Sequence, residues 1–406
     1  MLRSAEVIHL VRKRSHEFGV RGVDPNAVTF DLASAVARKD TIVAGVIQGI
    51  YERINKSSGV TFIRGQAEFT SPVGIRIGGR TIQAEKTILA VGARPVTPDI
   101  PGLAGAGFLT NFEALERGQL PESMIVVGGG YVGVEFAQMY SRFGTRVTLI
   151  GRASRIMPKE EPELSVLLAD VLRAEGVEVR TSTEVVGAGR IGGNRYVLAR
   201  TEKGEEKLEA HEILLATGRT ARVEGLGLEQ TGVTMRGDYV DFDSQMRTSA
   251  PNIWSIGDAN GGPMFTHRAT YDGPYAALNA VRNVGKEVDY RVVPRAVFTE
   301  PTLASVGLGE TEARAGGNEI RVGIHRFADS GRAKAMGQTD GLVKLVADAK
   351  TGELLGGHIL GPHADILIHQ VVTAMYNRGN AEPIAKSIHL HPTLSEVVKS
   401  AARALG

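Results

Sequence analysis

Cysteine is missing from all 406 residues of this sequence. These residues therefore form no disulfide, bind no metal through thiolate ligands and carry no thiol redox chemistry of their own. Long apolar runs are missing as well. Because no stretch of about 18 apolar residues occurs, we expect no membrane-spanning helix. The length predicts a globular protein of two or three domains.

An excess of charge of one sign is also absent. The 47 basic and 45 acidic side chains leave a formal net charge of +2, which favours neither a nucleic-acid partner nor another polyanion. The start of the chain has no apolar signal sequence, because Arg3, Glu6, His9 and Arg12 interrupt its apolar residues. We therefore expect a cytoplasmic enzyme without nucleic-acid or membrane partners.

A glycine-rich stretch in the middle of the chain carries the strongest pattern. The β-branched run from Ile125 to Val127 predicts a buried parallel strand, and the apolar spacing of residues 131–140 predicts a helix after it. A G-x-G-x-x-G fingerprint begins between the strand and the helix and consists of Gly128, Gly130 and Gly133. Such glycines allow a tight turn, close approach of a pyrophosphate and close helix–strand packing. Because a second strand at 146–150 completes the βαβ unit, we predict a dinucleotide site.

The end of that second strand indicates which nicotinamide nucleotide is bound. An NAD-specific unit places a carboxylate there, which accepts a hydrogen bond from the ribose 2′-OH. Here the strand is followed by Gly151 and Arg152, with Arg155 close by. Guanidinium groups favour a 2′-phosphate, so we predict NADPH, with NADH as the alternative. If the arginines instead pair with Glu160 and Glu161 at the surface, they contribute little.

Two strands of the chain end alike, which indicates an internal repeat. One ends at Gly92 and the other at Gly218, each followed closely by an arginine, and each comes after a predicted β-meander. The second copy opens with the fingerprint at Gly128, but no fingerprint precedes the first copy. We therefore expect the first dinucleotide domain to lack its opening βαβ unit, and whether Met1 is the true start stays open.

Two further segments complete the organisation of the chain. A short strand ends in Gly257-Asp258 and presents a carboxylate where α/β sheets bind ligands, with a plain turn as the alternative. From Arg295 onward, short antiparallel strands are followed by helices near 365–377 and 394–405. The predicted fold class is α/β, with two Rossmann-like dinucleotide domains, the first truncated, and a C-terminal α+β domain.

Motifs spread over nearly the whole chain carry a family resemblance. They are Gly65-Gln-Ala67, Ile88-Leu-Ala-Val-Gly92, Val127 to Glu135, Leu215-Ala-Thr-Gly-Arg219, Ile256-Gly-Asp258, Met264-Phe-Thr-His267, Val297-Phe-Thr-Glu-Pro301, Ala304-Ser-Val-Gly307 and His389 to Glu396. In this order they resemble the FAD-dependent pyridine nucleotide-disulfide oxidoreductases, the group of dihydrolipoamide dehydrogenase, glutathione reductase and mercuric reductase. The implied domains are a FAD-binding part at 1–120, an NAD(P)-binding domain at 121–240, a second FAD-binding part at 241–289 and a dimerisation domain at 290–406.

The resemblance also implies roles for single residues. Asp258 would bind the ribityl chain of FAD, and Glu135 would lie near the nicotinamide. His391 would act as an acid/base at the active site of the partner subunit, oriented by Glu396, in a homodimer formed through residues from about 295 to 406. The other cofactor-binding positions implied are Gly65, Ala67, Gly92, Gly128, Gly130, Gly133, Arg152, Gly218 and Thr266, and no metal site is implied.

Two family elements are missing from this sequence, namely the FAD-phosphate fingerprint and the redox Cys-x4-Cys pair. A polypeptide of these residues is therefore expected to bind FAD weakly or not at all, and three functions stay open. The first is electron transfer from NAD(P)H through FAD to a disulfide-type acceptor. The second is transfer to a quinone, metal or oxygen, and the third is an inactive binding or dimer partner. Thr393 and Glu396 also fit a capping box of the last helix, which is the structural alternative to catalysis.

Overall fold

The computed structural model describes all 406 residues and divides into two compact units. The first unit comprises Met1–Lys39, Thr97–Thr217 and Arg291–Gly406, and the second comprises Asp40–Val96 and Gly218–Tyr290. These units cut across the predicted domain bounds, because residues 1–39 and 97–120 group with the nucleotide-binding and C-terminal segments instead of with residues 40–96. No helix combines the length and apolar character needed to cross a bilayer.

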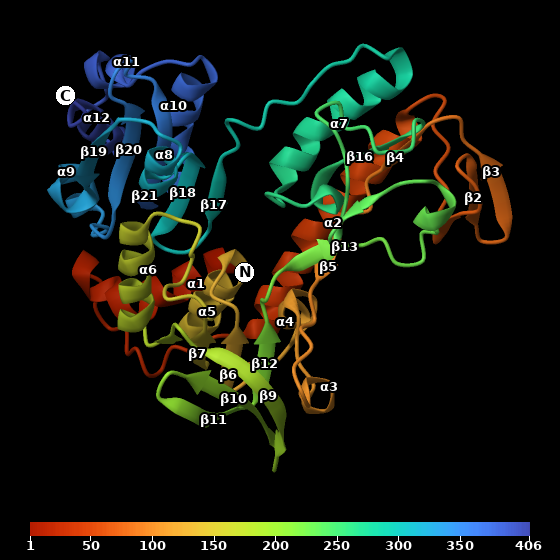
Figure 1. Ribbon diagram of the computed structural model, residues 1–406. Coiled ribbons are helices and arrows are strands. Elements are labelled where there is room, and N and C mark those ends of the chain that lie inside the picture. The colour runs from red at the N-terminus through yellow and green to blue at the C-terminus, as the bar shows by residue number, and fades with distance from the viewer. The chain divides into compact units, whose positions relative to one another are not determined.

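A four-stranded parallel sheet forms the centre of the first unit. Its order is β12-β6-β7-β8, with β12 at Glu212–Leu215, β6 at Ser123–Val127, β7 at Arg146–Ile150 and β8 at Glu178–Arg180. Helix α5 (Tyr131–Phe143) follows β6, and α6 (Pro162–Ala174) follows β7 (Figure 1). The βαβ unit predicted around the glycine fingerprint is therefore present. An antiparallel meander stands beside it, with β9 at Glu184–Ile191, β10 at Asn194–Thr201 and β11 at Gly204–Ala210.

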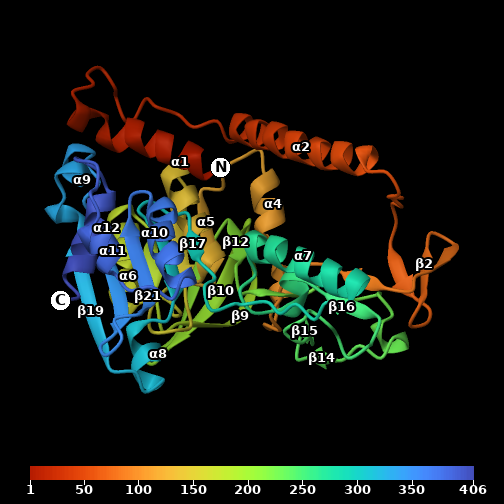
Figure 2. The same cartoon turned by 90° about the horizontal axis from the view of Figure 1, so that it is seen from above.

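The N-terminal helix belongs to the core of the first unit. Helix α1 (Leu2–His9) runs along α5 (Figure 2) and buries Ala5 and Ile8 in the same cluster as residues of α5. The ring of Phe30 stacks on that of Phe143 with centroids 4.0 Å apart. This apolar packing explains why the N-terminal residues group with the nucleotide-binding segment. Short elements complete the region, namely η1 (Leu10–Arg14), η2 (Ser15–Phe18), α3 (Leu103–Ala106) and α4 (Asn111–Glu116).

The C-terminal segment is an antiparallel sheet covered by helices, as predicted. Its order is β17-β18-β21-β20-β19, with bounds Arg295–Val297, Thr302–Gly307, Leu354–Gly361, Leu342–Asp348 and Ile320–Arg326. Helices α10 (Ala364–Tyr376) and α12 (Ser395–Arg403) pack on this sheet through the apolar cluster that includes Val371 and Val398. The remaining short helices are α8 (Glu310–Ala315), η5 (Phe327–Asp329), α9 (Gly331–Ala335) and α11 (Glu382–Lys386).

The second unit repeats part of the first in reduced form. An antiparallel meander, β1 (Ala67–Phe69), β2 (Gly74–Ile77) and β3 (Arg80–Gln83), precedes a parallel pair of β4 (Thr87–Leu89) and β16 (Ile253–Ser255). This parallel sheet has two strands where the first unit has four. This unit also contains helix α7 (Thr266–Arg282) and the greater part of α2 (Leu32–Lys56). Its short elements are β5 (Ala93–Pro95), β13 (Arg219–Ala221), η3 (Leu228–Gln230), β14 (Met235–Arg236), β15 (Tyr239–Val240) and η4 (Gly257–Asn260).

Two regions of the second unit differ from a fully packed domain. In the meander predicted before Gly92, residues 60–66 form no strand, and pairing begins only at Ala67–Phe69. The helix α2 exposes an apolar stripe, which consists of Ile42, Val43, Val46, Ile47 and Ile50. Apolar side chains at this spacing ordinarily face a core. In this structure no other segment packs over these side chains, so they are exposed to solvent.

Candidate functional site

The predicted glycine fingerprint forms a bare helix N-terminus in the first unit. Gly128 has a φ of +123°, and a Cβ there would lie 2.2 Å from the carbonyl oxygen of Ala216. A Cβ on Gly133 would lie 1.8 Å from the carbonyl oxygen of Gly128, so the helix packs directly on the loop. Gly130 is the N-cap of α5, has no side-chain cap, and a Cβ there would meet open space. The first N–H groups of α5 are therefore available to an anion such as a pyrophosphate, and these residues fit a dinucleotide.

The segment after β7 packs against this loop. The N–H of Met157 donates to the carbonyl oxygen of Gly129 at 2.7 Å. Arg152 is exposed and makes no hydrogen bond or ion pair, while Arg155 donates to the carbonyl oxygen of Pro158 at 3.0 Å. The alternative in which these arginines pair with Glu160 and Glu161 is not formed. The guanidinium of Arg152, just beyond the carboxyl end of β7, thus stays available for a ligand.

Glu135 of α5 connects the fingerprint helix to the C-terminal segment. Its Oε1 accepts a hydrogen bond from the backbone N–H of Phe298 at 2.7 Å. Burial raises the pKa of the Glu135 carboxyl, and the bond from Phe298 offsets part of this rise. A carboxyl group with a raised pKa beside a nucleotide loop is a candidate for a functional role.

The buried carboxylate of Glu160 is a partner of the fingerprint that sequence reasoning missed. It accepts from the hydroxyl of Tyr131 at 2.5 Å, from Nε of Arg295 at 2.7 Å and from the hydroxyl of Ser305 at 2.6 Å. Burial beside this carboxylate raises the pKa of Tyr131. The sequence suggests Glu160 only as an alternative surface partner of the arginines, and no local pattern identifies partners 135 and 145 positions away.

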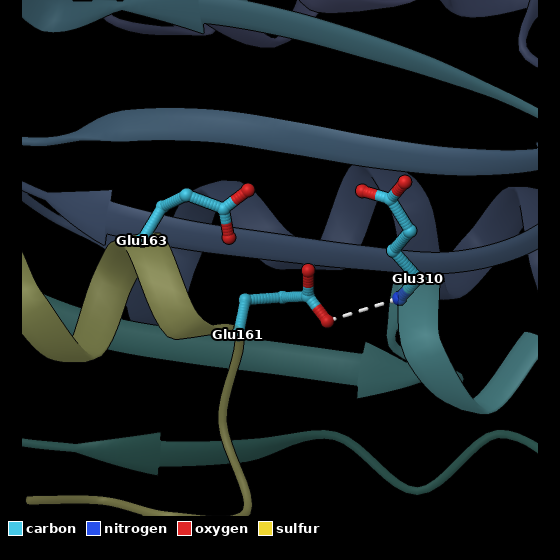
Figure 3. A group of neighbouring side chains, drawn as sticks. All are labelled: Glu161, Glu163 and Glu310. Carbon is cyan, nitrogen blue, oxygen red and sulfur yellow. Dashed lines mark hydrogen bonds between the residues drawn. The ribbon is translucent and has the colours of Figure 1, made fainter. Parts of the chain in front are cut away.

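Three carboxylates surround a buried lysine close to this network. Glu161, Glu163 and Glu310 converge in Figure 3, where the backbone N–H of Glu310 donates to Glu161 at 3.0 Å. Nζ of Lys344 lies 2.5 to 2.9 Å from all three, and its side chain is 1% exposed. Because this ammonium already occupies the centre of the acidic group, we assign no metal to it.

The predicted flavin residues gather at one edge of the parallel strands in the second unit. The N–H of Ile256 donates to Leu89 at 3.0 Å, so the carboxyl ends of β16 and β4 lie together. There Asp258 lies 3.8 Å from Arg219, and α7 begins at Thr266 without a side-chain cap. Gly92 and Gly218, with φ of +68° and +124°, follow β4 and β12. Gly65 and Ala67 lie instead at the start of the meander, where a Cβ on Gly65 would meet Ile77 at 2.7 Å.

The fit of this second site to FAD is only partial. A carboxylate and a helix N-terminus suit the ribityl end of a flavin nucleotide. However, the two-stranded parallel sheet of this unit carries no strand–glycine–helix turn like the one at Gly128. We therefore derive no chemical step through the flavin.

His391 and Glu396 form a pair in the C-terminal segment. Nδ1 of His391 lies 3.1 and 3.2 Å from the two carboxylate oxygens of Glu396, and the imidazole is 81% exposed. Glu396 also accepts from the backbone N–H of Thr393 at 3.0 Å, and both contacts lower its pKa. The capping box is therefore only half formed, because the hydroxyl of Thr393 donates to the carbonyl oxygen of Leu390 and accepts no hydrogen bond from a helix N–H. No hydrogen bond links this pair to the glycine loop.

Known proteins resemble the chain over almost its entire length. A family model described as pyridine nucleotide-disulphide oxidoreductase matches residues 6–273, and the corresponding dimerisation-domain model matches residues 293–402. The dihydrolipoyl dehydrogenase of Chlorobaculum parvum is 38% identical over 99% of this chain and 86% of its own length. The mercuric reductase of Streptomyces lividans is 34% identical over 99% and 85%.

Solved structures show the same fold. The HOCl-induced flavoprotein disulfide reductase RclA from Escherichia coli superposes with a TM-score of 0.86 at 28% identity, covering 100% of this chain and 89% of its own. LpdA from Mycobacterium tuberculosis gives a TM-score of 0.88 at 27% identity, covering 100% and 88%. The predicted mixed α/β class with a C-terminal dimerisation domain is thereby confirmed.

Proposed function

Because the chain belongs to the pyridine nucleotide-disulphide oxidoreductase family, whose members are FAD- and NAD(P)-dependent oxidoreductases, we propose that it is an NADPH-dependent member of the dihydrolipoamide dehydrogenase type. The observation that carries this proposal is the uncapped N-terminus of α5 with Arg152 nearby. A bound nicotinamide would supply hydride chemistry, and its nucleotide would be held by the glycine loop from Gly128 to Gly133 and by Arg152. The residues of this chain bind the nucleotide, orient it and handle protons.

The preference for NADPH rests on the free guanidinium of Arg152. No carboxylate follows β7 at Gly151 or Arg152 to accept from a ribose 2′-OH. An unpaired guanidinium binds a 2′-phosphate through charge-assisted hydrogen bonds, whereas a hydroxyl offers it no charge. Since Glu160 and Glu161 bind other partners, neither carboxylate competes for Arg152.

The acid/base role is assigned to His391, with Glu396 as its positioning residue. Nδ1 of His391 faces Glu396, and Nε2 makes no hydrogen bond within the chain. An imidazole held in this way by a carboxylate can accept or donate a proton at Nε2 near neutral pH. The exposure of the pair suits a site completed by a second copy of the chain, because two neighbouring apolar side chains, Ile388 and Leu390, are 100% and 82% exposed. We therefore include a homodimer in the proposal.

The absence of cysteine from these residues favours a second class of electron acceptor, namely a quinone, a metal ion or oxygen. An enzyme of the dihydrolipoamide dehydrogenase type reduces a disulfide acceptor through thiol exchange. The residues of this sequence supply no thiol for that exchange. Reduction of a quinone, a metal ion or oxygen needs no protein thiol. Turnover of NADPH with a quinone but not with lipoamide, measured with FAD added, would identify this second class.

The nucleotide assignment is tested by direct binding of NADPH and NADH. Arg152→Ala should weaken NADPH binding about 10- to 100-fold, the range expected for one or two charge-assisted hydrogen bonds, and leave NADH binding unchanged. Arg146→Ala is the matched control, because Arg146 is exposed at the opposite end of the same strand. Equal affinities for the two nucleotides in the wild type, unaltered by Arg152→Ala, would refute the preference.

A further inference from the structure

One face of the fingerprint helix is bonded along its length to the C-terminal segment. The polar residues Tyr131, Glu135, Gln138 and Arg142 follow one another at intervals of four, three and four, so they form a single stripe on α5. Each of them reaches the segment from Arg295 to Glu300, either directly or through Glu160. The helix that presents the glycine loop is thus attached to the dimerisation domain along four successive contacts.

The later part of this stripe binds the backbone and side chain of Glu300. Gln138 donates to the carbonyl oxygen of Glu300 at 2.7 Å and accepts from its N–H at 2.8 Å. Arg142 lies 2.5 Å from the Glu300 carboxylate and 2.6 Å from Glu175, and its side chain is 4% exposed. These bonds fix the middle and the end of α5, where no ligand is expected.

The first turn of α5 is fixed by a different contact. Tyr131 is the first helical residue after the N-cap Gly130, and that glycine supplies no side-chain cap. The hydroxyl of Tyr131 donates to Glu160, whose carboxylate is held in turn by Arg295 and Ser305. Arg295 and Ser305 are directly paired across β17 and β18. The anchor of the first turn is therefore a fixed point on a sheet.

We propose that Tyr131, Glu160 and Arg295 are positioning residues for dinucleotide binding, which hold the first turn of α5 so that its N–H groups are ordered before the pyrophosphate arrives. A turn that begins at glycines has much backbone freedom to lose on binding. The anchor removes this freedom in advance, and preorganisation of this kind increases affinity. The inference rests on the proposed nucleotide site at Gly128 to Gly133.

The test compares two Tyr→Phe substitutions on the same helix. Tyr131→Phe removes the bond to Glu160, and Tyr140→Phe removes a buried bond of 2.6 Å to the carbonyl oxygen of Ala114 at the other end of α5. Binding of NADPH is measured directly for both variants, together with their urea midpoints. Tyr131→Phe should weaken binding about tenfold, as expected for the loss of one hydrogen bond to a charged group, and Tyr140→Phe should leave the affinity unchanged.

The stability measurement separates positioning from a general loss of packing. Both variants should be destabilised to a similar extent, with KM for the nucleotide raised only in Tyr131→Phe and kcat little changed. Equal effects of the two variants on affinity, or no effect of either, would overturn the inference while leaving the proposed function intact. A wild type that binds neither NADPH nor NADH would overturn the proposed function, and this inference with it.

Discussion

Lys344→Met is expected to destabilise the first unit by about 3–5 kcal/mol near neutral pH, the usual cost of removing one partner from a buried ion pair. Lys344 is 1% exposed and neutralises Glu161, whose side chain is 5% exposed. The other two carboxylates, Glu163 and Glu310, are 44% and 29% exposed, so solvent screens them and their share is small. Methionine retains most of the packing of the lysine stem, so the expected loss comes mainly from leaving the Glu161 carboxylate unpaired.

The same network gives this variant a characteristic pH dependence. Burial acts to raise the pKa of Glu163, but the bond from Lys344, a backbone N–H and the charge of Lys344 together outweigh it and lower the pKa. The bond from Lys344 is the main cause of the lowered pKa of Glu310. Groups with a lowered folded pKa contribute stability above their unfolded value of 4.5, and they lose it as the pH falls through the folded value. Burial acts to lower the pKa of Lys344, but the bonds to the three carboxylates together outweigh it and raise the pKa. The contribution of Lys344 is therefore lost only as the pH rises above 10.5. The difference between wild type and Lys344→Met should therefore be largest between these limits and shrink in acid.

The assay is urea unfolding followed by circular dichroism, at about pH 7 and about pH 4. Lys386→Met is the matched control, because Lys386 pairs with Glu382 at the surface with 76% of its side chain exposed, and it should not change the midpoint measurably. A Lys344→Met variant within about 1 kcal/mol of wild type at neutral pH would refute the assignment of a buried ion pair. An equal difference at both pH values would refute the charge argument.

Two further predictions concern the C-terminal segment. His391→Gln should lower turnover with the electron acceptor by about 10²- to 10⁴-fold, the usual contribution of a general acid or base, and leave the Kd for NADPH unchanged; a loss of nucleotide affinity would contradict the role. Leu390→Asp should convert the dimer to a monomer in light scattering at micromolar concentration, because it places a charge on the exposed apolar surface beside His391. Val166→Asp, at a 53% exposed position of α6, should leave the dimer intact, and a dimer that persists in Leu390→Asp would place the interface elsewhere.

The sequence by itself determined the features that depend on neighbouring residues. The glycine turn at Gly128 and the meander before each repeat strand follow from local spacing, and the structure contains all of them. The family resemblance implied the pairing of His391 with Glu396, which lie five residues apart, and the structure places their side chains in contact. Local patterns succeed here because a strand–glycine–helix turn and a short loop leave the backbone few alternatives.

Tertiary structure alone decided which charged residues are buried and with whom. One alternative open from the sequence pairs Glu160 and Glu161 with Arg152 and Arg155 at the surface. In the structure Glu160 binds Arg295 and Glu161 binds Lys344, both from the distant C-terminal sheet. Local sequence also does not determine where strand pairing begins, since the meander pairs only from Ala67 onward. The physical reason is the same in each case. A carboxylate or a backbone N–H has no preferred partner until folding brings one close and excludes water, and the partner is then selected by the packing of distant segments.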